Sequence, residues 1–199
     1  MNPPSLLGRD AVWDAPWLAE AGAKVVVSGR TAADELRGDG HDVIDVVFDA
    51  QNRDDVQRLV NTAVDAFGGL DVMIVNHGIG RAAKAEAIEP HEWDEMININ
   101  LTSAFSCAQV AGRQMLDQGR GGSIVFTSST SSLVVFRNLT SYGAAKAGLD
   151  HTARHLAVEW GSHNIRVNMV APGYMTNFMR GSESRYENPD DIAAVIALT

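Results

Sequence analysis

Tyr142 and Lys146 lie four residues apart in a stretch whose composition favours a helix. From Ser141, a suitable N-cap residue, to Glu159, helix-forming residues dominate and apolar residues recur at helical spacing. The tyrosine and the lysine are therefore expected on one helix face, one turn apart. A lysine ammonium at that position favours the phenolate and lowers a tyrosine pKa that is ordinarily about 10. Such a tyrosine can exchange a proton near neutral pH, although the same spacing also arises by chance on helix surfaces.

The stretch before this helix has the pattern of a buried strand that opens onto a site. Residues 122–129 form a short apolar run that ends in hydroxyl side chains, and Ser129 stands thirteen residues before Tyr142. A hydroxyl side chain near this position is expected by chance, since several surround Ser129, namely Thr127, Ser128, Thr130, Ser131 and Ser132. Only the thirteen-residue offset from Tyr142 distinguishes Ser129 from them.

Elements of two kinds alternate along the chain. Runs typical of buried strands occur at residues 25–28, 43–48, 71–76, 122–129 and 164–171. Helical patterns occur at 32–37, 54–67, 90–116 and 141–159, and a last one begins at 189–198. This alternation predicts an α/β fold with a doubly wound, mainly parallel sheet, in a single domain over residues 1–199. In such sheets ligands bind beyond the carboxyl ends of the strands, where we expect Asp49, Asn76, Ser129 and Pro172 to meet.

Residues 1–17 diverge from the alternating pattern. Pro16 is expected to interrupt any helix over residues 11–18, and Gly22 is expected to cap a helix end before the first strand.

Charge, apolar runs and cysteine content disfavour several classes of protein. The 199 residues carry a net charge of −9, which argues against partners coated in phosphate such as nucleic acids and anionic membranes. No apolar run approaches the roughly 18 residues of a membrane span, and no targeting signal is recognised. The one cysteine, Cys107, excludes an internal disulfide, so a reducing cytoplasm is expected.

Several stretches between Leu18 and Thr176, together with the Ser129, Tyr142 and Lys146 signature, resemble the classical short-chain dehydrogenase/reductase family. Residues 71–78 resemble its Asn-Asn-Ala-Gly segment, with Val75 replacing the first Asn and His77 the Ala. Residues 98–101 resemble the segment with the fourth catalytic residue, and residues 172–176 the loop beside the nicotinamide. The resemblance implies a Rossmann-like fold and a carbonyl–alcohol oxidoreductase that uses NADP or NAD and a small-molecule substrate.

The resemblance assigns four catalytic residues. It implies that Tyr142 is the general acid and base, and that Ser129 hydrogen-bonds the substrate oxygen. Lys146 would lower the pKa of Tyr142 and hold the nicotinamide ribose. Asn100 would anchor a water that links Lys146 to solvent. Read without the resemblance, Asn100 is compatible with an ordinary polar helix residue.

The resemblance also assigns cofactor contacts. Asp49 matches the carboxylate that meets the adenine amino group, although an Asp there could instead cap the next helix. Asn76 and Gly78 match the backbone that lines the adenosine. Arg30, with Gly29 before it in the place of an acidic residue, favours the 2′-phosphate of NADP, although a lone arginine can simply be solvated. Around the nicotinamide the matching positions are Pro172, Gly173, Met175 and Thr176, besides Tyr142 and Lys146.

The chain departs from the family at both ends, so the predicted fold is incomplete there. The family's Thr-Gly-x-x-x-Gly-x-Gly turn, which cradles the cofactor diphosphate, has no counterpart, since Gly8 is the only glycine before Gly22. Residues 177–188 form a shortened substrate loop, and the last family strand has no match. We therefore expect weak cofactor affinity. The alternative function is a non-catalytic or partner-dependent truncated paralogue that acts through subunit association, whereas a serine hydrolase is disfavoured because Gly-x-Ser-x-Gly is missing.

His151 and His155 form an i, i+4 pair that could bind a metal. On an ideal helix they lie almost opposite Tyr142 and Lys146, and no third ligand is visible, so no metal site is predicted. In the family this helix and the one before it build a subunit interface, so a homo-oligomer, dimer or tetramer, is expected.

Overall fold

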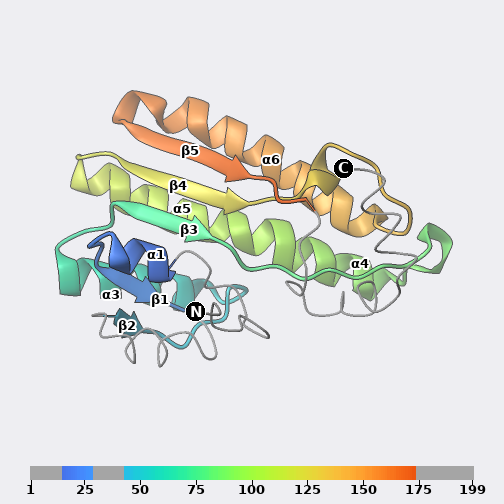
Figure 1. Cartoon of the computed structure of the whole chain (residues 1–199), viewed down its shortest axis with the longest axis horizontal. Coiled ribbons are helices and arrows are strands. Elements are labelled where there is room, and N and C mark those ends of the chain that lie inside the picture. Colours follow the sequence, from blue (N-terminus) through green and yellow to red (C-terminus); the bar gives the residue numbers. More distant parts are fainter. Residues whose placement is uncertain (1–14, 29–42, 174–199) are drawn as a thin grey trace, which may run out of the picture.

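The computed structural model describes residues 15–28 and 43–173 (Figure 1). Its strands are β1 (Val25–Val27), β2 (Val43–Asp45), β3 (Val72–Val75), β4 (Gly122–Thr127) and β5 (Ile165–Val170). Its helices are α1 (Ala15–Glu20), α3 (Arg53–Phe67), α4 (Pro90–Ile97), α5 (Ser103–Gln118) and α6 (Thr140–Trp160), with a π-helical segment η2 (Asn98–Thr102) joining α4 to α5. Short 3₁₀ turns occupy Ala85–Ala87 (η1), Thr130–Ser132 (η3) and Gly161–His163 (η4).

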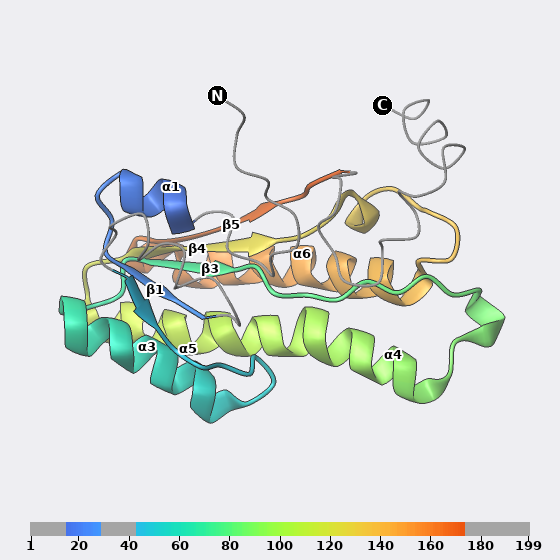
Figure 2. The same ribbon diagram turned by 60° about the horizontal axis from the view of Figure 1, so that its bottom comes forward.

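The strands form two parallel sheets within the described ranges. One has the order β1-β2, and the other has the order β3-β4-β5 with β4 in the centre. Val75 lies opposite Phe126, and Phe126 lies opposite Met169. Figure 2 shows α1 on one face of the strands and α3, α5 and α6 on the other. The predicted α/β class with parallel strands and helices on both faces is confirmed.

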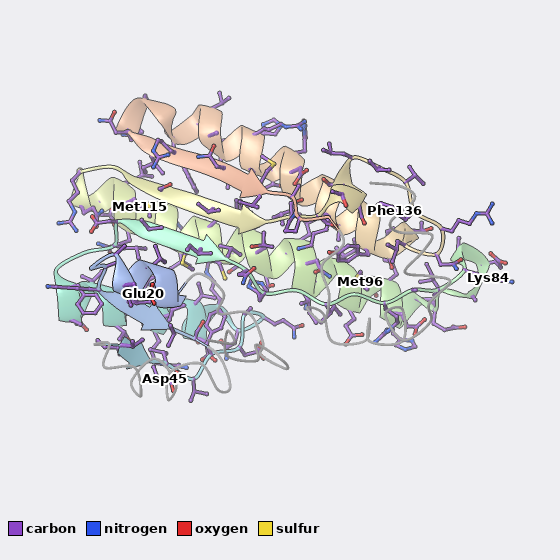
Figure 3. All side chains as sticks on the ribbon, viewed as in Figure 1. Glu20, Asp45, Lys84, Met96, Met115 and Phe136 are labelled. Carbon is purple, nitrogen blue, oxygen red and sulfur yellow. The ribbon has the colours of Figure 1, made fainter. Side chains whose placement is uncertain are left out.

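The core lies between the β3-β4-β5 sheet and the helices α5 and α6. Phe126 and Ile124 of β4 are fully buried, and Ala111 and Met115 of α5 pack in the same cluster. Full burial of a side chain of this size contributes about 1.5–3 kcal/mol. Gly122 begins β4 directly against Met115, labelled in Figure 3, and an added Cβ at Gly122 would collide with its sulfur. This packing fixes the position of β4 along the sheet. Ser129 follows the carboxyl end of β4, so its position is fixed as well.

Helix α3 follows its sequence pattern closely. The pattern over residues 54–67 places six apolar residues at helical spacing. Four of them, Val56, Leu59, Val60 and Ala63, are buried, and Val64 and Phe67 are half-buried. Asn52 is the N-cap and accepts from the Asp54 amide, while Gly68 ends the helix with φ of 80°. The cap that was considered for Asp49 therefore belongs to Asn52.

Three boundaries differ from the sequence-based expectation. Pro16 does not interrupt a helix, because it stands in the first turn of α1, where no intrahelical N–H is required. Helix α6 begins at Thr140 with Leu139 as its N-cap, so Ser141 is not the cap. The strand expected to reach residue 48 ends at Asp45, which leaves Asp49 on the loop before α3.

Several predicted features lie outside the described residues. They are Arg30, Met175, Thr176, the substrate loop 177–188 and the helical patterns at 32–37 and 189–198. Within residues 15–28 and 43–173, no helix is both long and apolar enough to cross a bilayer.

Candidate functional site

The carboxyl ends of β4 and β5 meet where the sequence predicted a site. The Ser128 amide donates to the Val170 carbonyl at 2.7 Å, and the Thr130 amide donates to the Pro172 carbonyl at 3.0 Å. These bonds hold the segment around Ser129 against residues 171–173. Predicted catalytic and nicotinamide-loop residues are therefore neighbours.

Tyr142 lies at the N-terminal end of α6 and is 6% exposed. Its phenol is hydrogen-bonded to the Ser129 side chain. Burial raises the pKa of Tyr142, and the Ser129 hydrogen bond opposes that rise because it stabilises the phenolate. Ser129 Oγ also accepts from the Ser131 amide at 3.1 Å, so its hydroxyl hydrogen is available to the phenol oxygen.

Lys146 is buried one turn further along α6, with 3% of its surface exposed. Its Nζ donates to the Thr127 carbonyl at 2.8 Å and lies 5.8 Å from the centre of the Tyr142 ring. Burial lowers the pKa of Lys146 to about 8, against the opposing effect of Asp150. The two side chains share a face, as the spacing predicted.

The expected direction of the Tyr142 pKa is wrong for this structure. The four-residue spacing predicted that Lys146 lowers the pKa of Tyr142, whereas burial raises that pKa. Burial likewise lowers the pKa of Lys146, to about 8. The two effects have one cause, because both groups are withdrawn from water.

Asn100 occupies the π-helical segment η2 and is completely buried. Its Oδ1 accepts from the Ile79 amide at 3.1 Å, and its Nδ2 donates to the carbonyls of Ile79 and Met96 at 3.1 and 3.0 Å. Such π segments are rare and are frequently found at functional sites. The wider turn sets Asn100 against the loop that follows β3, so Asn100 is not an ordinary solvated helix residue.

Gly78 lies in the space between Asn100 and Lys146. A Cβ at this position would lie 2.7 Å from Asn100 Oδ1 and 3.5 Å from Lys146 Nζ. The first distance is shorter than a van der Waals contact, so only glycine fits here without a shift of the asparagine. The backbone of the predicted adenosine-binding segment thus runs directly beside two predicted catalytic side chains.

His77 departs from the family pattern, which has an alanine at this position. Its Nε2 lies 2.7 Å from Ser103 Oγ, and Ser103 Oγ donates to the Ile99 carbonyl at 2.7 Å. Because the hydroxyl hydrogen is directed to Ile99, Nε2 must carry the ring hydrogen and donate to Ser103. Burial, with the nearby charge of Lys146, lowers the pKa of His77 to about 4, so the ring is neutral at pH 7. His77 therefore joins the loop after β3 to the start of α5.

Asp49 lies on an exposed loop and forms hydrogen bonds with residues that follow it closely in the sequence. Its Oδ1 accepts from the Gln51 amide at 2.9 Å, and its amide donates to Asp55 Oδ2 at 2.9 Å. The carboxylate is close enough to His77 to oppose the lowering of the histidine pKa, which sets Asp49 near the loop that carries Asn76 and Gly78.

His151 and His155 lie on the exposed part of α6, with 3.2 Å between their Nε2 atoms. No cluster of three metal-ligating side chains occurs among the residues that the structure describes. The pair has no third ligand among the described residues.

A family model described as short chain dehydrogenase matches residues 14–188. The chain is 32% identical over 176 residues to a 2-dehydro-3-deoxy-D-gluconate 5-dehydrogenase of Escherichia coli, a match that covers 84% of this chain and 70% of that protein. It is also 32% identical over 197 residues to a 3-oxoacyl-(acyl-carrier-protein) reductase of Synechocystis, covering 90% and 79%. The chain spans 61% to 80% of the length of such curated relatives.

Solved structures give the same family. A gluconate 5-dehydrogenase of Burkholderia cenocepacia in complex with NADP and tartrate superposes with a TM-score of 0.79 at 28% identity, covering 87% of this chain and 69% of that one. A short-chain type dehydrogenase/reductase of Mycobacterium marinum superposes with a TM-score of 0.76 at 34% identity, covering 80% and 66%. The family uses a nicotinamide dinucleotide as its cofactor.

Proposed function

Because this chain belongs to the short-chain dehydrogenase family, we propose that it interconverts a carbonyl and a secondary alcohol by hydride transfer, with NADP or NAD as cofactor. The observation that carries the proposal is the hydrogen bond between Ser129 and the buried Tyr142, one helical turn from the buried Lys146. A nicotinamide supplies or accepts the hydride. The chain's residues must therefore hold the carbonyl and move one proton.

Tyr142 is the proton donor in the reducing direction and the proton acceptor in the oxidising direction. A raised pKa keeps its phenol protonated at neutral pH, which suits the donor role. Ser129 would donate to the substrate oxygen as charge develops there, since its hydroxyl already reaches the Tyr142 oxygen. Lys146, with a pKa of about 8, would hold the ribose and exchange protons near neutral pH.

The described residues at this edge fit a dinucleotide. Gly78 is exposed, and its lack of a side chain lets its backbone lie directly against Asn100 and Lys146. We propose that Asn76 and Gly78 line the adenosine, that Asp49 meets the adenine, and that Lys146, Pro172 and Gly173 lie beside the nicotinamide half. Arg30, Met175 and Thr176 stay predictions on residues outside the described ranges, and NADP is favoured through Arg30.

The substrate side of the site is apolar. Leu133, Val134 and Val135, which follow η3 next to Ser129, are 70%, 55% and 96% exposed. Apolar side chains held in water beside a polar centre are typical of a ligand surface. We propose a small-molecule substrate in which an apolar portion adjoins the reacting carbonyl or alcohol.

We also propose a homo-oligomer, dimer or tetramer, formed through α5 and α6. Phe105 on α5 is 38% exposed, and Val158 on α6 is 83% exposed. Association of these two helices with a second copy would bury both side chains. Sedimentation velocity with Val158→Glu tests this, since the substitution should shift the protein to the monomer.

The cofactor is tested by titrating the full chain with NADPH and with NADH while nicotinamide fluorescence is followed. Saturable but weak binding, tighter for NADPH than for NADH, is expected, because the diphosphate-binding turn has no counterpart in the chain. Micromolar affinity for NADPH would show that other contacts compensate for that turn. Tyr142→Phe should bind NADPH with a similar affinity, because the phenol acts on the substrate. If neither nucleotide binds, the autonomous enzyme is contradicted and the partner-dependent paralogue replaces it.

A further inference from the structure

The π turn of η2 is bonded at both of its ends to loops from other parts of the chain. The Ser103 amide donates to the Asn98 carbonyl five residues earlier, which is the bond that defines a π turn. At one end Asn98 Nδ2 donates to Gln51 Oε1 at 2.7 Å, and at the other Ser103 Oγ lies 2.7 Å from His77 Nε2. Gln51 belongs to the loop after β2 and His77 to the loop after β3, so one helical turn contacts both loops.

Gln51 connects the π turn to the carboxylate of Asp49. Its side chain accepts from Asn98, while its backbone amide donates to Asp49 Oδ1 at 2.9 Å. The Asn52 amide also donates to the Asp49 carbonyl at 2.9 Å, so the backbone turns tightly between these residues. Because this turn is closed by two hydrogen bonds, a contact that fixes the Gln51 side chain also fixes the direction of the Asp49 carboxylate.

Arg53, the first residue of α3, provides a second contact between the same loop and the helix that continues from η2. Its Nη2 donates to Gln109 Oε1 at 2.8 Å, and its Nη1 donates to Ser106 Oγ at 3.3 Å. Both acceptors lie on α5, which Figure 2 shows alongside α3. The loop after β2 is therefore bonded to the η2–α5 helix on both sides of Asn52.

Hydrogen bonds, and not burial, determine where this loop lies. None of residues 47–52 is buried, so apolar packing contributes little to its position. Arg58 donates to the Val47 carbonyl at 2.9 Å, but Arg58 belongs to α3, which begins directly after the loop. That bond does not place the loop relative to η2. The bonds from Asn98 and Arg53 do.

The two loops that η2 contacts also lie side by side. The Phe48 ring packs edge-to-face against the His77 ring, with 6.5 Å between the ring centres. In the middle of η2, Asn100 bonds both backbone polar groups of Ile79 at 3.1 Å each. The two loops proposed to line the adenosine half of the cofactor therefore share one support.

We propose that Asn98 and Arg53 are positioning residues for the cofactor, which hold the loop after β2 so that the Asp49 carboxylate is directed at the adenine before the cofactor binds. A loop that is already ordered loses less conformational entropy on binding, so the affinity is higher. The inference rests on the proposed function, since it requires Asp49 to meet the adenine. Asn98 acts at the adenosine half, whereas Asn100, in the same turn, lies beside the loop that approaches Lys146.

The test is a titration of wild type and Asn98→Ala with NADPH and with NADH. The variant should bind both nucleotides about three- to tenfold more weakly, the factor that corresponds to one net hydrogen bond. The weakening should be equal for the two nucleotides, because they share the adenine. Gln57→Ala is the matched control, since Gln57 Nε2 donates to Asn61 Oδ1 at 3.0 Å in an exposed amide–amide bond of α3 away from Asp49. It should bind as the wild type does.

A double-mutant cycle tests whether Asn98 acts through Asp49. In an Asp49→Ala background, Asn98→Ala should weaken binding no further, because the carboxylate that it positions is gone. Without nucleotide, the Gln51 amide should exchange its hydrogen faster in Asn98→Ala than in the wild type, and at the wild-type rate in Gln57→Ala. This exchange measures the order of the loop independently of any cofactor.

The outcomes separate the positioning role from the proposed function. If the wild type binds neither nucleotide, the oxidoreductase is contradicted, and the adenine contact with it. If the wild type binds and Asn98→Ala binds equally well, only the positioning role is overturned. Equal weakening by Asn98→Ala with and without the Asp49 carboxylate would also overturn it, as would an unchanged exchange rate of the Gln51 amide.

Discussion

The side-chain amide of Asn100 pairs with both backbone polar groups of Ile79, at 3.1 Å each. This reciprocal contact joins the π-helical segment to the loop after β3, and it aligns Gly78 between Asn100 and Lys146. The segment that the proposed cofactor would contact is thus held by a residue of the proposed catalytic set.

Replacing Asn100 should therefore destabilise the protein as well as impair the site. Asn100→Ala leaves the Ile79 amide and two carbonyls without their partner, and an unsatisfied buried group costs about 1–3 kcal/mol. Asn98→Ala is the matched control from the same segment, because the Asn98 side chain bonds Gln51 at an exposed position. Urea unfolding should show a clear decrease in the free energy of unfolding for Asn100→Ala, and a decrease of less than about 0.5 kcal/mol for Asn98→Ala. Equal losses would contradict the buried role of Asn100.

The packing of α5 on α6 depends on Gly112. A Cβ at this position would collide with the indole ring of Trp160, and Gly112 is buried. Gly112→Ala should lower the free energy of unfolding by about 1–3 kcal/mol, the usual cost of overpacking a core. Gly161→Ala, at a glycine where an added Cβ meets nothing within 4 Å, should change it little. A Gly112→Ala protein as stable as the wild type would show that the two helices can separate without cost.

The pH dependence of stability should reveal the buried Lys146. Its pKa of about 8 in the folded chain lies below the unfolded value of about 10.4. Between these values the unfolded chain binds more protons, so the free energy of unfolding rises with pH, by at most about 1.4 kcal/mol per pH unit. Lys146→Met removes this contribution. Urea unfolding at pH 7, 8.5 and 9.5 should show that the wild type gains stability relative to Lys146→Met as the pH rises. If the free energies of unfolding of the two proteins change equally with pH, Lys146 is not buried as an ammonium.

The buried His77 should make the free energy of unfolding depend on pH below pH 6.5. Its pKa of about 4 in the fold lies below the unfolded value of about 6.5, so the folded ring stays neutral while the unfolded chain takes up a proton. The stability that this neutral ring contributes is present above pH 6.5 and is lost as the pH falls toward 4. His77→Gln keeps an N–H donor for Ser103 and should lose less stability than the wild type between pH 6.5 and 4.5. His163→Gln, at an exposed histidine, should lose stability with falling pH as the wild type does. If His77→Gln loses as much stability as the wild type, His77 is not held neutral in the folded chain.

The sequence predicted the features that depend on local pattern. The apolar period over 54–67 gave the buried face of α3, and the four-residue spacing put Tyr142 and Lys146 on one face of α6. Alternating runs were enough for the parallel α/β class, since each parallel connection requires a crossover.

Features that depend on tertiary packing were missed. The segment over 90–116 reads as one regular helix, and no residue in it marks the π turn at Asn98–Thr102. The rise in the Tyr142 pKa follows from burial, which spacing does not report. Likewise, His77 differs from the family pattern, but only the fold shows that it bonds Ser103, 26 residues away.

Tyr142 is proposed to transfer the proton in a nicotinamide-dependent carbonyl reduction. The most direct measurement is NADPH consumption with a panel of ketones that carry apolar substituents, by wild type, Tyr142→Phe and Ser129→Ala. Loss of the acid–base group is expected to lower kcat by about 10²–10⁴-fold in Tyr142→Phe, with unchanged NADPH affinity. A Tyr142→Phe protein that reduces the same ketone at the wild-type rate would show that Tyr142 does not transfer the proton.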